Sequence, residues 1–400
     1  MSRRAFLRVG GLGVVGAALA LTALATLAGC QRSTFGAPGV RTNAPVSGEV
    51  LGNGPVKVAL LLPLSATGNA GQLALNLKNA ADLAIRDFQT AGIQVLVKDD
   101  RGTVEGARAA VSQAVSEGAE LIMGPLFAQS VTAVSSVARG ANVSVVAFST
   151  DTSTAARGVY LLSFLPQSDV DRIISFAASR GKRSFAALIP NNAYGTVVEA
   201  ALQRAVANGG GRVMSVERYE LDQGSMQTKA VAVAGLVKAG TVDAIFMPDA
   251  GDAAPFLGQI LAANGVDPAA VTYLGSGQWD DTRIANESTL NGAWYPAPDR
   301  AGFTGFAQRY QAAFGQAPIR TATLSYDATS LAAGLAGRFG AERFSDQTLT
   351  TPNGFIGIDG AFRFLQNGTN QRGLAVYQIN RGTAQLIEAA PKTFARAPGA

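Results

Sequence analysis

Residues 56–68 read Val-Lys-Val-Ala-Leu-Leu-Leu-Pro-Leu-Ser-Ala-Thr-Gly, and this stretch decides the fold class. Its first seven residues form a nearly continuous apolar run that ends at Pro63, which is typical of a β-strand buried on both faces of a parallel sheet. Apolar residues then recur at helical spacing from Leu73 to Phe88 and stop before Gly92, which predicts a helix directly after the strand. The folded part of the chain therefore starts with a strand followed by a helix.

The same alternation repeats along the chain. Further strands are predicted at Ile93–Val97, Glu120–Met123, Val143–Phe148, Ser184–Ile189, Arg212–Tyr219, Asp243–Met247 and Val271–Leu274. Helices are predicted at Val104–Glu117, Gln129–Arg139, Asp169–Ser179, Tyr194–Asn208, Gln227–Lys238 and Ala253–Ala263. Short apolar strands that alternate with helices predict an α/β fold, in which mostly parallel sheets carry helices on both faces. These strands are too many for a single sheet, so we expect two lobes, with the boundary between them near Phe164–Pro166.

The pattern changes after Asn291. An extended crossing at Trp294–Pro298 precedes an aromatic-rich helix, a second helix at Ser325–Arg338, and strands around Ile358–Phe364 and Leu374–Asn380. We therefore expect residues 55–165 to form the first part of lobe 1 and residues 166–295 to form lobe 2. Residues 296–400 are expected to return to lobe 1, the hinge and a tail. A chain with several hinge crossings can close around a ligand.

The start of the chain is typical of an export signal. Arg3, Arg4 and Arg8 precede an uncharged stretch that runs to Thr26 and ends in Leu-Ala-Gly-Cys30. A basic start, a short apolar run and small residues before a cut site indicate a removable signal peptide at residues 1–29. The segment Ser-Arg-Arg-Ala-Phe-Leu-Arg is similar to a twin-arginine motif, while an ordinary secretory signal with a chance Arg pair stays open. A Gly-x-Gly-x-x-Gly spacing at 11–16 lies inside this signal and is no nucleotide site.

The end of the signal resembles a bacterial lipobox, which implies lipidation of Cys30. Residues 30–54 are rich in Gly, Pro, Ser, Thr and Asn and are predicted to be a flexible tether to the membrane. The resemblance implies a lipoprotein of the cell envelope that faces the periplasm. Gln31 after the cysteine favours the outer membrane in a Gram-negative cell.

Composition excludes several classes of function. The sequence has no histidine and a single cysteine, so histidine-based catalysis, thiolate metal sites and disulfides are excluded. Without its signal peptide the chain has 30 basic and 28 acidic residues, a net charge of +2, which does not indicate a nucleic-acid partner. We expect no metal, no cofactor and no enzymatic activity. A hydrolase with two facing carboxylates remains an alternative, although Asp99–Asp100, Asp280–Asp281 and the pair Asp169 and Asp171 fit turn and helix-start positions better.

With these elements in order, the chain resembles the type I periplasmic solute-binding proteins of the leucine/isoleucine/valine-binding group. The resemblance covers about Val56 to Leu386 and rests on the order of five segments. They are residues 56–68, 120–126 (Glu-Leu-Ile-Met-Gly-Pro-Leu), 145–150 (Val-Val-Ala-Phe-Ser-Thr), 189–195 (Ile-Pro-Asn-Asn-Ala-Tyr-Gly) and 357–364. The resemblance implies two lobes joined by hinge crossings and a small polar ligand, amino-acid-like or amide- and peptide-like, held between them for an ABC permease.

Parallel α/β sheets bind ligands beyond the carboxyl ends of their strands, where helix N-termini offer free N–H groups. The residues at these ends are Ser65, Ala66, Phe127, Ala128, Ser149, Thr150, Asp151, Tyr194 and Asp249. Small hydroxyl side chains there suit a polar ligand, and Phe127 and Tyr194 suit its apolar part. The serines and threonines fit the role of helix caps equally well.

The chain departs from the amino-acid-binding pattern at three places. Ala128 stands where the family has a serine, Asp151 follows the Ser-Thr pair, and residues 275–278 contain no acid for a ligand ammonium group. We therefore expect no tight binding of branched-chain amino acids. The chain is also similar to lipoproteins that activate penicillin-binding proteins in peptidoglycan synthesis, which makes a peptidoglycan synthase the alternative partner.

Overall fold

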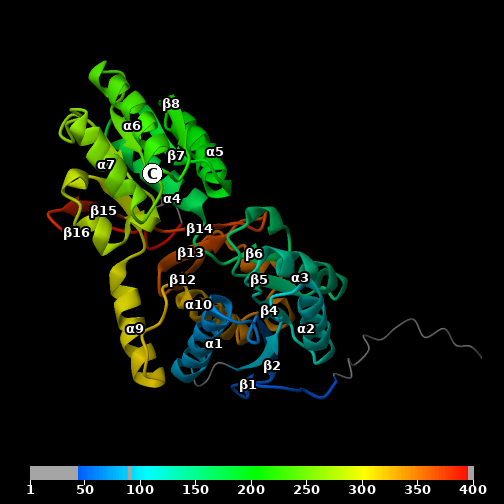
Figure 1. Ribbon diagram of the computed structural model, residues 1–400. Helices are drawn as coiled ribbons and strands as arrows, with labels where there is room; N and C mark the ends of the chain where they lie inside the picture. Colours follow the sequence, from blue (N-terminus) through cyan, green and yellow to red (C-terminus); the bar gives the residue numbers. More distant parts are fainter. Residues whose placement is uncertain (1–43, 89–91, 395–400) are drawn as a thin grey trace, which may run out of the picture. The chain divides into compact units, whose positions relative to one another are not determined.

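The computed structural model describes residues 44–88 and 92–394. The predicted signal peptide at 1–29, the predicted lipidation site Cys30 and the first part of the predicted tether lie outside the described residues. The described chain has the two-lobed α/β fold that the sequence predicts, with one mostly parallel sheet in each lobe and a small third sheet beside them (Figure 1).

The sheet of the first lobe has six strands in the order β1-β3-β2-β4-β5-β6. Their bounds are β1 Val50–Leu51, β2 Val56–Leu62, β3 Ile93–Asp99, β4 Leu121–Met123, β5 Ser144–Ala147 and β6 Val159–Leu161. All neighbours are parallel except β1, which runs antiparallel to β3. The continuous apolar sequence of β2 follows from this arrangement, because β2 lies in the sheet interior with both faces covered.

Helices cover both faces of this sheet. One face packs on α1 (Asn69–Asp87) and α10 (Ala322–Ala336), and the other packs on α2 (Val104–Ser116) and α3 (Ala128–Gly140). Alternate residues of β2 belong to the two cores: Leu60 faces α1 and α10, whereas Leu61 faces α2 and α3. The aromatic-rich helix α9 (Arg300–Phe314) buries Phe306 and Tyr310 against α1 and α10.

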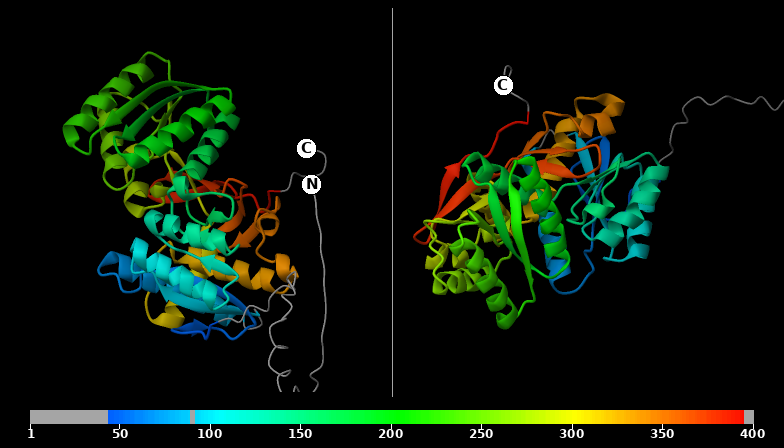
Figure 2. Two further views of the ribbon diagram at one scale, coloured as in Figure 1. Left: turned by 90° about the vertical axis from the view of Figure 1, so that its right-hand side faces the viewer. Right: turned by 90° about the horizontal axis from the view of Figure 1, so that it is seen from above.

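The sheet of the second lobe has seven strands in the order β16-β15-β11-β10-β9-β7-β8. Their bounds are β7 Ser184–Pro190, β8 Arg212–Tyr219, β9 Ala244–Phe246, β10 Thr272–Leu274, β11 Trp294–Ala297, β15 Ala375–Asn380 and β16 Thr383–Glu388. Helices α4 (Pro166–Ser179) and α5 (Ala193–Asn208) cover one face, and α6 (Gln223–Lys238) and α7 (Ala253–Ala263) cover the other. Both views of Figure 2 show the strands of this lobe between their helices.

The third sheet is antiparallel and ends shortly before β15, where the chain passes into the sheet of the second lobe. It consists of β12 (Phe355–Gly357), β13 (Gly360–Phe364) and β14 (Asn370–Arg372). Asn370 donates from Nδ2 to the carbonyls of Leu161 and Ser163, each at 2.8 Å, and Arg372 donates from Nε to the carbonyl of Ser163 at 3.0 Å. These bonds attach β14 to the end of β6 and to the segment that follows it, where the chain first passes from the first lobe to the second.

The structure differs from the sequence prediction at both ends of the folded part. The predicted tether reaches to residue 54, but Ala44 already donates its backbone N–H to Ser116, and Ser47 donates to the carboxylate of Glu117. Because Glu117 and Lys98 form a buried ion pair, the chain before β1 is needed to complete their hydrogen bonds. At the other end, the predicted tail supplies β15 and β16 to the sheet of the second lobe, next to β11.

Candidate functional site

The carboxyl ends of β7, β9 and β10 in the second lobe carry a polar cluster. Tyr194, in the first turn of α5, lies with its hydroxyl 3.1 Å from the carbonyl of Pro248 and 3.3 Å from Ser276 Oγ. Ser276 in turn donates from Oγ to the same carbonyl at 2.6 Å. The structure thus brings the predicted residue Tyr194 together with Ser276, which the sequence analysis does not single out.

Asp249 belongs to the same cluster. Its Oδ2 accepts a hydrogen bond from the hydroxyl of Tyr219 at 3.0 Å, and its carbonyl accepts one from Trp279 Nε1 at 2.9 Å. Trp279 is completely buried, so the Asp249 backbone has a fixed position. Burial raises the pKa of Tyr194 to about 12, and the neighbouring carboxylates add to this rise, so its hydroxyl stays a neutral hydrogen-bonding group.

Asp169 is an acid of this cluster that the sequence analysis assigns to a helix start. It lies in the first turn of α4, and its Oδ2 accepts the backbone N–H of Gly277 at 2.9 Å. A Cβ atom at position 277 would lie 2.8 Å from the same oxygen, so the glycine permits the contact. Desolvation raises the pKa of Asp169 to about 7, although part of the residue reaches solvent.

Asp169 supplies an acidic group at residues 275–278, a segment that has no acidic side chain of its own. The segment itself has no acidic side chain, as the sequence shows, but a carboxylate reaches Gly277 from α4. The two residues are 108 positions apart in the chain, and no local pattern predicts their contact. The one signal in the sequence is Gly277 itself, because a glycine between polar neighbours after a strand allows another group to approach the backbone closely.

In the first lobe, several predicted ligand-binding residues serve as local caps. Ser149 Oγ accepts the backbone N–H of Asp151 at 3.1 Å. Asp151 Oδ1 accepts the backbone N–H of Ser153 at 3.0 Å and its hydroxyl at 2.7 Å, which caps the short 3-10 helix at Thr152–Thr154. Thr150 is exposed between them. This geometry fits the capping interpretation of Ser149 and Asp151.

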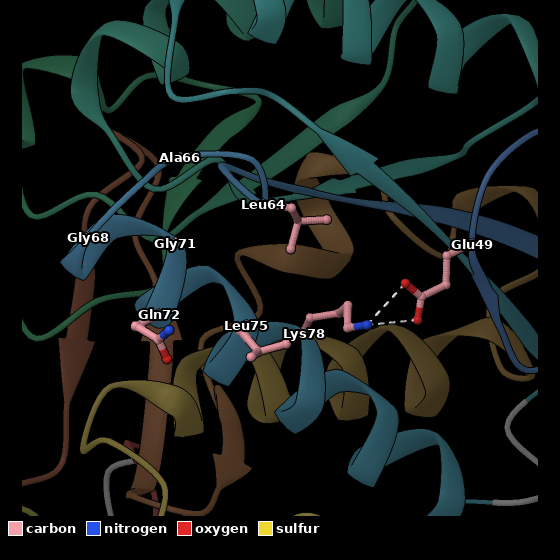
Figure 3. A pocket seen from close by; sticks show the side chains of 8 residues that line it. All are labelled: Glu49, Leu64, Ala66, Gly68, Gly71, Gln72, Leu75 and Lys78. Atoms are coloured by element: carbon pink, nitrogen blue, oxygen red, sulfur yellow. Dashed lines mark hydrogen bonds and ion pairs between the residues drawn. The ribbon is translucent and has the colours of Figure 1, made fainter.

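The loop between β2 and α1 also carries predicted residues. Ser65 donates its backbone N–H to Asp99 Oδ1 at 3.2 Å, which ties the loop to the end of β3. Ala66 lines a hollow of about 420 Å³ that Figure 3 shows from close by. Lys78 reaches across this hollow to Glu49, with 3.0 Å between Nζ and Oε1. Glu49 belongs to the segment predicted as a tether, so that segment helps to form the hollow.

Phe127 and Ala128 mark the start of α3. The ring of Phe127 lies close to Gly102, where an added Cβ would be 3.2 Å from it. Phe127 is the residue before the helix and gives no side-chain cap, and Ala128 offers no hydroxyl at this point. The structure therefore places Phe127 beside the turn between β3 and α2.

Comparison with known proteins identifies the family. A family model described as "Periplasmic binding protein" matches residues 55–384, which is most of the chain. The chain belongs to the periplasmic binding protein family. Substrate-binding proteins of this family are not enzymes, and they act in the periplasm or otherwise outside the cytoplasm. No curated protein sequence matches the chain at a significant level.

Solved structures with this fold are similar over almost their whole length. A putative branched-chain amino acid ABC transporter protein from Rhodospirillum rubrum has a TM-score of 0.72 and 17% identity, with 83% of this chain and 99% of that one covered. A substrate-binding protein from Sphaerobacter thermophilus has a TM-score of 0.64 and 18% identity, covering 85% and 98%. A solute-binding protein from R. palustris in complex with benzoate has a TM-score of 0.56 and 17% identity, covering 86% and 98%. At these identities the similarity shows the fold.

Two properties of the described residues bear on membrane and metal binding. Within residues 44–88 and 92–394, no helix has the length and apolar character that crossing a membrane requires. In the same part of the chain, no group of three or more acidic, cysteine or histidine residues is arranged to hold a metal ion.

Proposed function

We propose that this protein is a solute-binding component of an ABC transporter and binds a small polar ligand between its lobes. The observation that carries the proposal is the cluster of Tyr194, Ser276, Asp249 and Asp169 at the carboxyl ends of the second-lobe strands. This is the edge at which ligands bind in parallel α/β sheets. The family match over residues 55–384 supports the same role.

The cluster suits a ligand with a hydrogen-bond donor or a cationic group. Asp169 uses one carboxylate oxygen for Gly277, which leaves the other available, and part of the residue is open to solvent. Tyr194 adds a neutral hydroxyl that lies close enough to Asp169 for the carboxylate to raise its pKa. Such a combination binds an ammonium or amide group through charge-assisted hydrogen bonds. The similar structures include one with benzoate and one with leucine, so the fold accommodates ligands of this size.

The first lobe argues against tight binding of leucine. Ala128 provides no hydroxyl at the start of α3, and Asp151 would repel a carboxylate near Ser149 and Thr150. One lost charge-assisted hydrogen bond costs about 1.5–3 kcal/mol, which is about a tenfold to hundredfold loss of affinity. We therefore expect an amide, a peptide-like compound or a modified amino acid to bind better than a free branched-chain amino acid.

We further propose that the protein is attached to the membrane through lipid on Cys30 and faces the periplasm. The support is the order of basic residues, apolar stretch and Leu-Ala-Gly-Cys30 at the start of the chain. Neither the family match nor the similar structures point to the alternative role as an activator of penicillin-binding proteins. A pull-down with a peptidoglycan synthase tests that alternative directly.

The experiment for ligand binding is a thermal-shift screen of the purified protein against amino acids, small amides, peptides and aromatic carboxylates. A ligand that binds only the folded state raises the melting temperature as its concentration increases. We expect such a compound among the amides or peptides and a smaller shift with leucine. The ligand should no longer raise the melting temperature of Tyr194→Phe or Asp169→Asn. It should still raise the melting temperature of Arg212→Gln, a variant at an exposed position of strand β8. A shift that both site variants retain would contradict this site.

A further inference from the structure

The C-terminal tail, residues 389–394, connects the two lobes once more after the last strand. β16 ends at Glu388 in the sheet of the second lobe, and Ala390 still packs against the core of that lobe. From there the tail reaches Gly373, in the crossing between β14 and β15, and Arg363 of β13. Figure 2 shows the red end of the chain passing from β16 toward the orange strands β13 and β14.

The hairpin that receives the tail belongs to the first lobe. Phe362 and Phe364 of β13 are almost completely buried in the core that α1 and α10 form on the first sheet. Asn370 of β14 adds its hydrogen bonds to carbonyls at the end of β6 and just after it. A contact between the tail and Arg363 therefore joins the strands of the second lobe to the core of the first.

Arg363 offers the tail a fixed surface. Its Nε and Nη2 donate to Gln371 Oε1 at 2.9 and 2.7 Å, and its Nη1 donates to the carbonyl of Pro352 at 3.1 Å. The guanidinium group lies 4.8 Å from the centre of the Phe394 ring. Because three hydrogen bonds hold the guanidinium group, the aromatic ring docks on a cationic surface that is already in place.

The second contact of the tail is at Gly373. The backbone N–H of this residue donates to the carbonyl of Ala361 at 2.8 Å, so the crossing is itself attached to β13. A Cβ atom added at position 373 would lie 2.7 Å from the carbonyl oxygen of Pro391 and 3.2 Å from its ring. The tail backbone therefore lies directly on the crossing, at a distance that a glycine permits.

Beyond Ala390 the tail lies on the surface. Pro391, Lys392 and Thr393 are exposed, and Pro391 and Phe394 form part of the wall of a hollow of about 810 Å³. The other walls of this hollow come mainly from α4 and the β13–β14 hairpin. Since the tail borders a hollow, it can leave its position without opening a core. A cation–π contact at an exposed site changes an equilibrium by only about two- to fivefold.

We propose that the C-terminal tail is a strap that restrains the movement of the two lobes about the hinge. One end of the strap is fixed in the second sheet, so its contacts with Arg363 and Gly373 must break when β16 moves relative to β13. Rotation about the crossings is the movement by which a two-lobed domain opens and closes. The strap is weak enough to release during this movement. The inference goes beyond the proposed function, because it holds whichever ligand binds.

Distances between spin labels on the two lobes test the proposal without a ligand. Cys30→Ser removes the only cysteine of the sequence, and Arg139→Cys on α3 and Lys238→Cys on α6 then place one label at an exposed position of each lobe. Double electron–electron resonance gives the distribution of the distance between the labels. We expect the population outside the main distance to rise about two- to fivefold when Phe394→Ala is added.

Gly373→Ala should broaden the distribution at least as much, because its added Cβ displaces Pro391 while it lies 3.5 Å from Ala361, an ordinary contact. Two matched controls should leave the distribution unchanged. In Gly334→Ala on α10, no other group of the described chain lies within 4 Å of the added Cβ. Phe339→Ala removes a ring that is 49% exposed and lies outside the tail and the third sheet.

Two results would overturn the proposal. One is a distribution in Phe394→Ala and Gly373→Ala that matches that of the labelled reference protein. The other is equal broadening in the two control variants, which places the effect outside the strap. Circular dichroism melting of each variant establishes that it is folded. Phe394→Ala changes only a ring at the surface, so it keeps the test decisive if Gly373→Ala disturbs the crossing itself.

Discussion

Substitution of Asp169 by Asn should change how the stability of the protein depends on pH. Burial raises the pKa of this carboxyl from 3.8 to about 7, so between about pH 4 and pH 7 the folded chain holds a proton that the unfolded chain has released. The backbone N–H of Gly277 and the charge of Arg372 stabilise the carboxylate and oppose this shift only in part. The contribution of the protonated group to stability is therefore complete below about pH 4 and is lost as the pH rises through 7.

The size of the effect follows from the difference between the folded and unfolded pKa values. A difference of about three corresponds to an upper limit of about 4 kcal/mol, and solvent at the exposed part of the residue reduces it, so we expect about 1–3 kcal/mol. Asp169→Asn keeps an oxygen for Gly277 but carries no charge. Urea denaturation from about pH 4 to about pH 8 should therefore show a flatter profile for the variant and a gain in stability at the upper end. Asp252→Asn, at a fully exposed side chain, is the control. Equal pH profiles for Asp169→Asn and the unmodified protein would refute this reasoning.

Three further predictions concern other parts of the chain. Glu117→Gln should destabilise the protein by about 3–5 kcal/mol in urea denaturation, because it leaves the buried Lys98 without its charged partner at 2.7 Å. The control, Glu105→Gln in the first turn of α2, should have little effect. Similar losses of stability in both variants would contradict the role of the ion pair. Gly277→Ala should weaken ligand binding in the thermal-shift assay, since the added Cβ would lie 2.8 Å from Asp169 Oδ2, and unchanged binding would argue against Asp169 as a ligand-binding residue. Cys30→Ser should release folded protein from the membrane fraction, and retention there would exclude lipid on Cys30 as the anchor.

The regular elements could be predicted because parallel strands are recognisable as apolar runs. Strand β8 at Arg212–Tyr219 and helix α7 at Ala253–Ala263 have the predicted bounds. The sequence did not reveal β6 at Val159–Leu161, since three residues are too few to show a period. It also did not reveal that β15 and β16 extend the second sheet, because strand order depends on pairing between distant segments.

The candidate site was only partly predictable for a related reason. Tyr194 and Asp249 follow shortly after strands, so the rule about carboxyl ends identifies them. Asp169 comes from a helix, and its role depends on a contact with Gly277 across 108 residues. Ser149 and Asp151 also follow a strand, but their hydrogen bonds are local caps, and a sequence pattern does not distinguish a cap from a ligand contact.

Titration calorimetry measures whether the cluster around Asp169 and Tyr194 binds a small polar ligand. The measurement uses the compound with the largest shift in the thermal screen and compares the unmodified protein with Asp169→Asn and Arg212→Gln. The proposed function predicts saturable binding with one site, a loss of about tenfold or more in Asp169→Asn, and no change in Arg212→Gln. Equal affinity of all three proteins for that compound would contradict it.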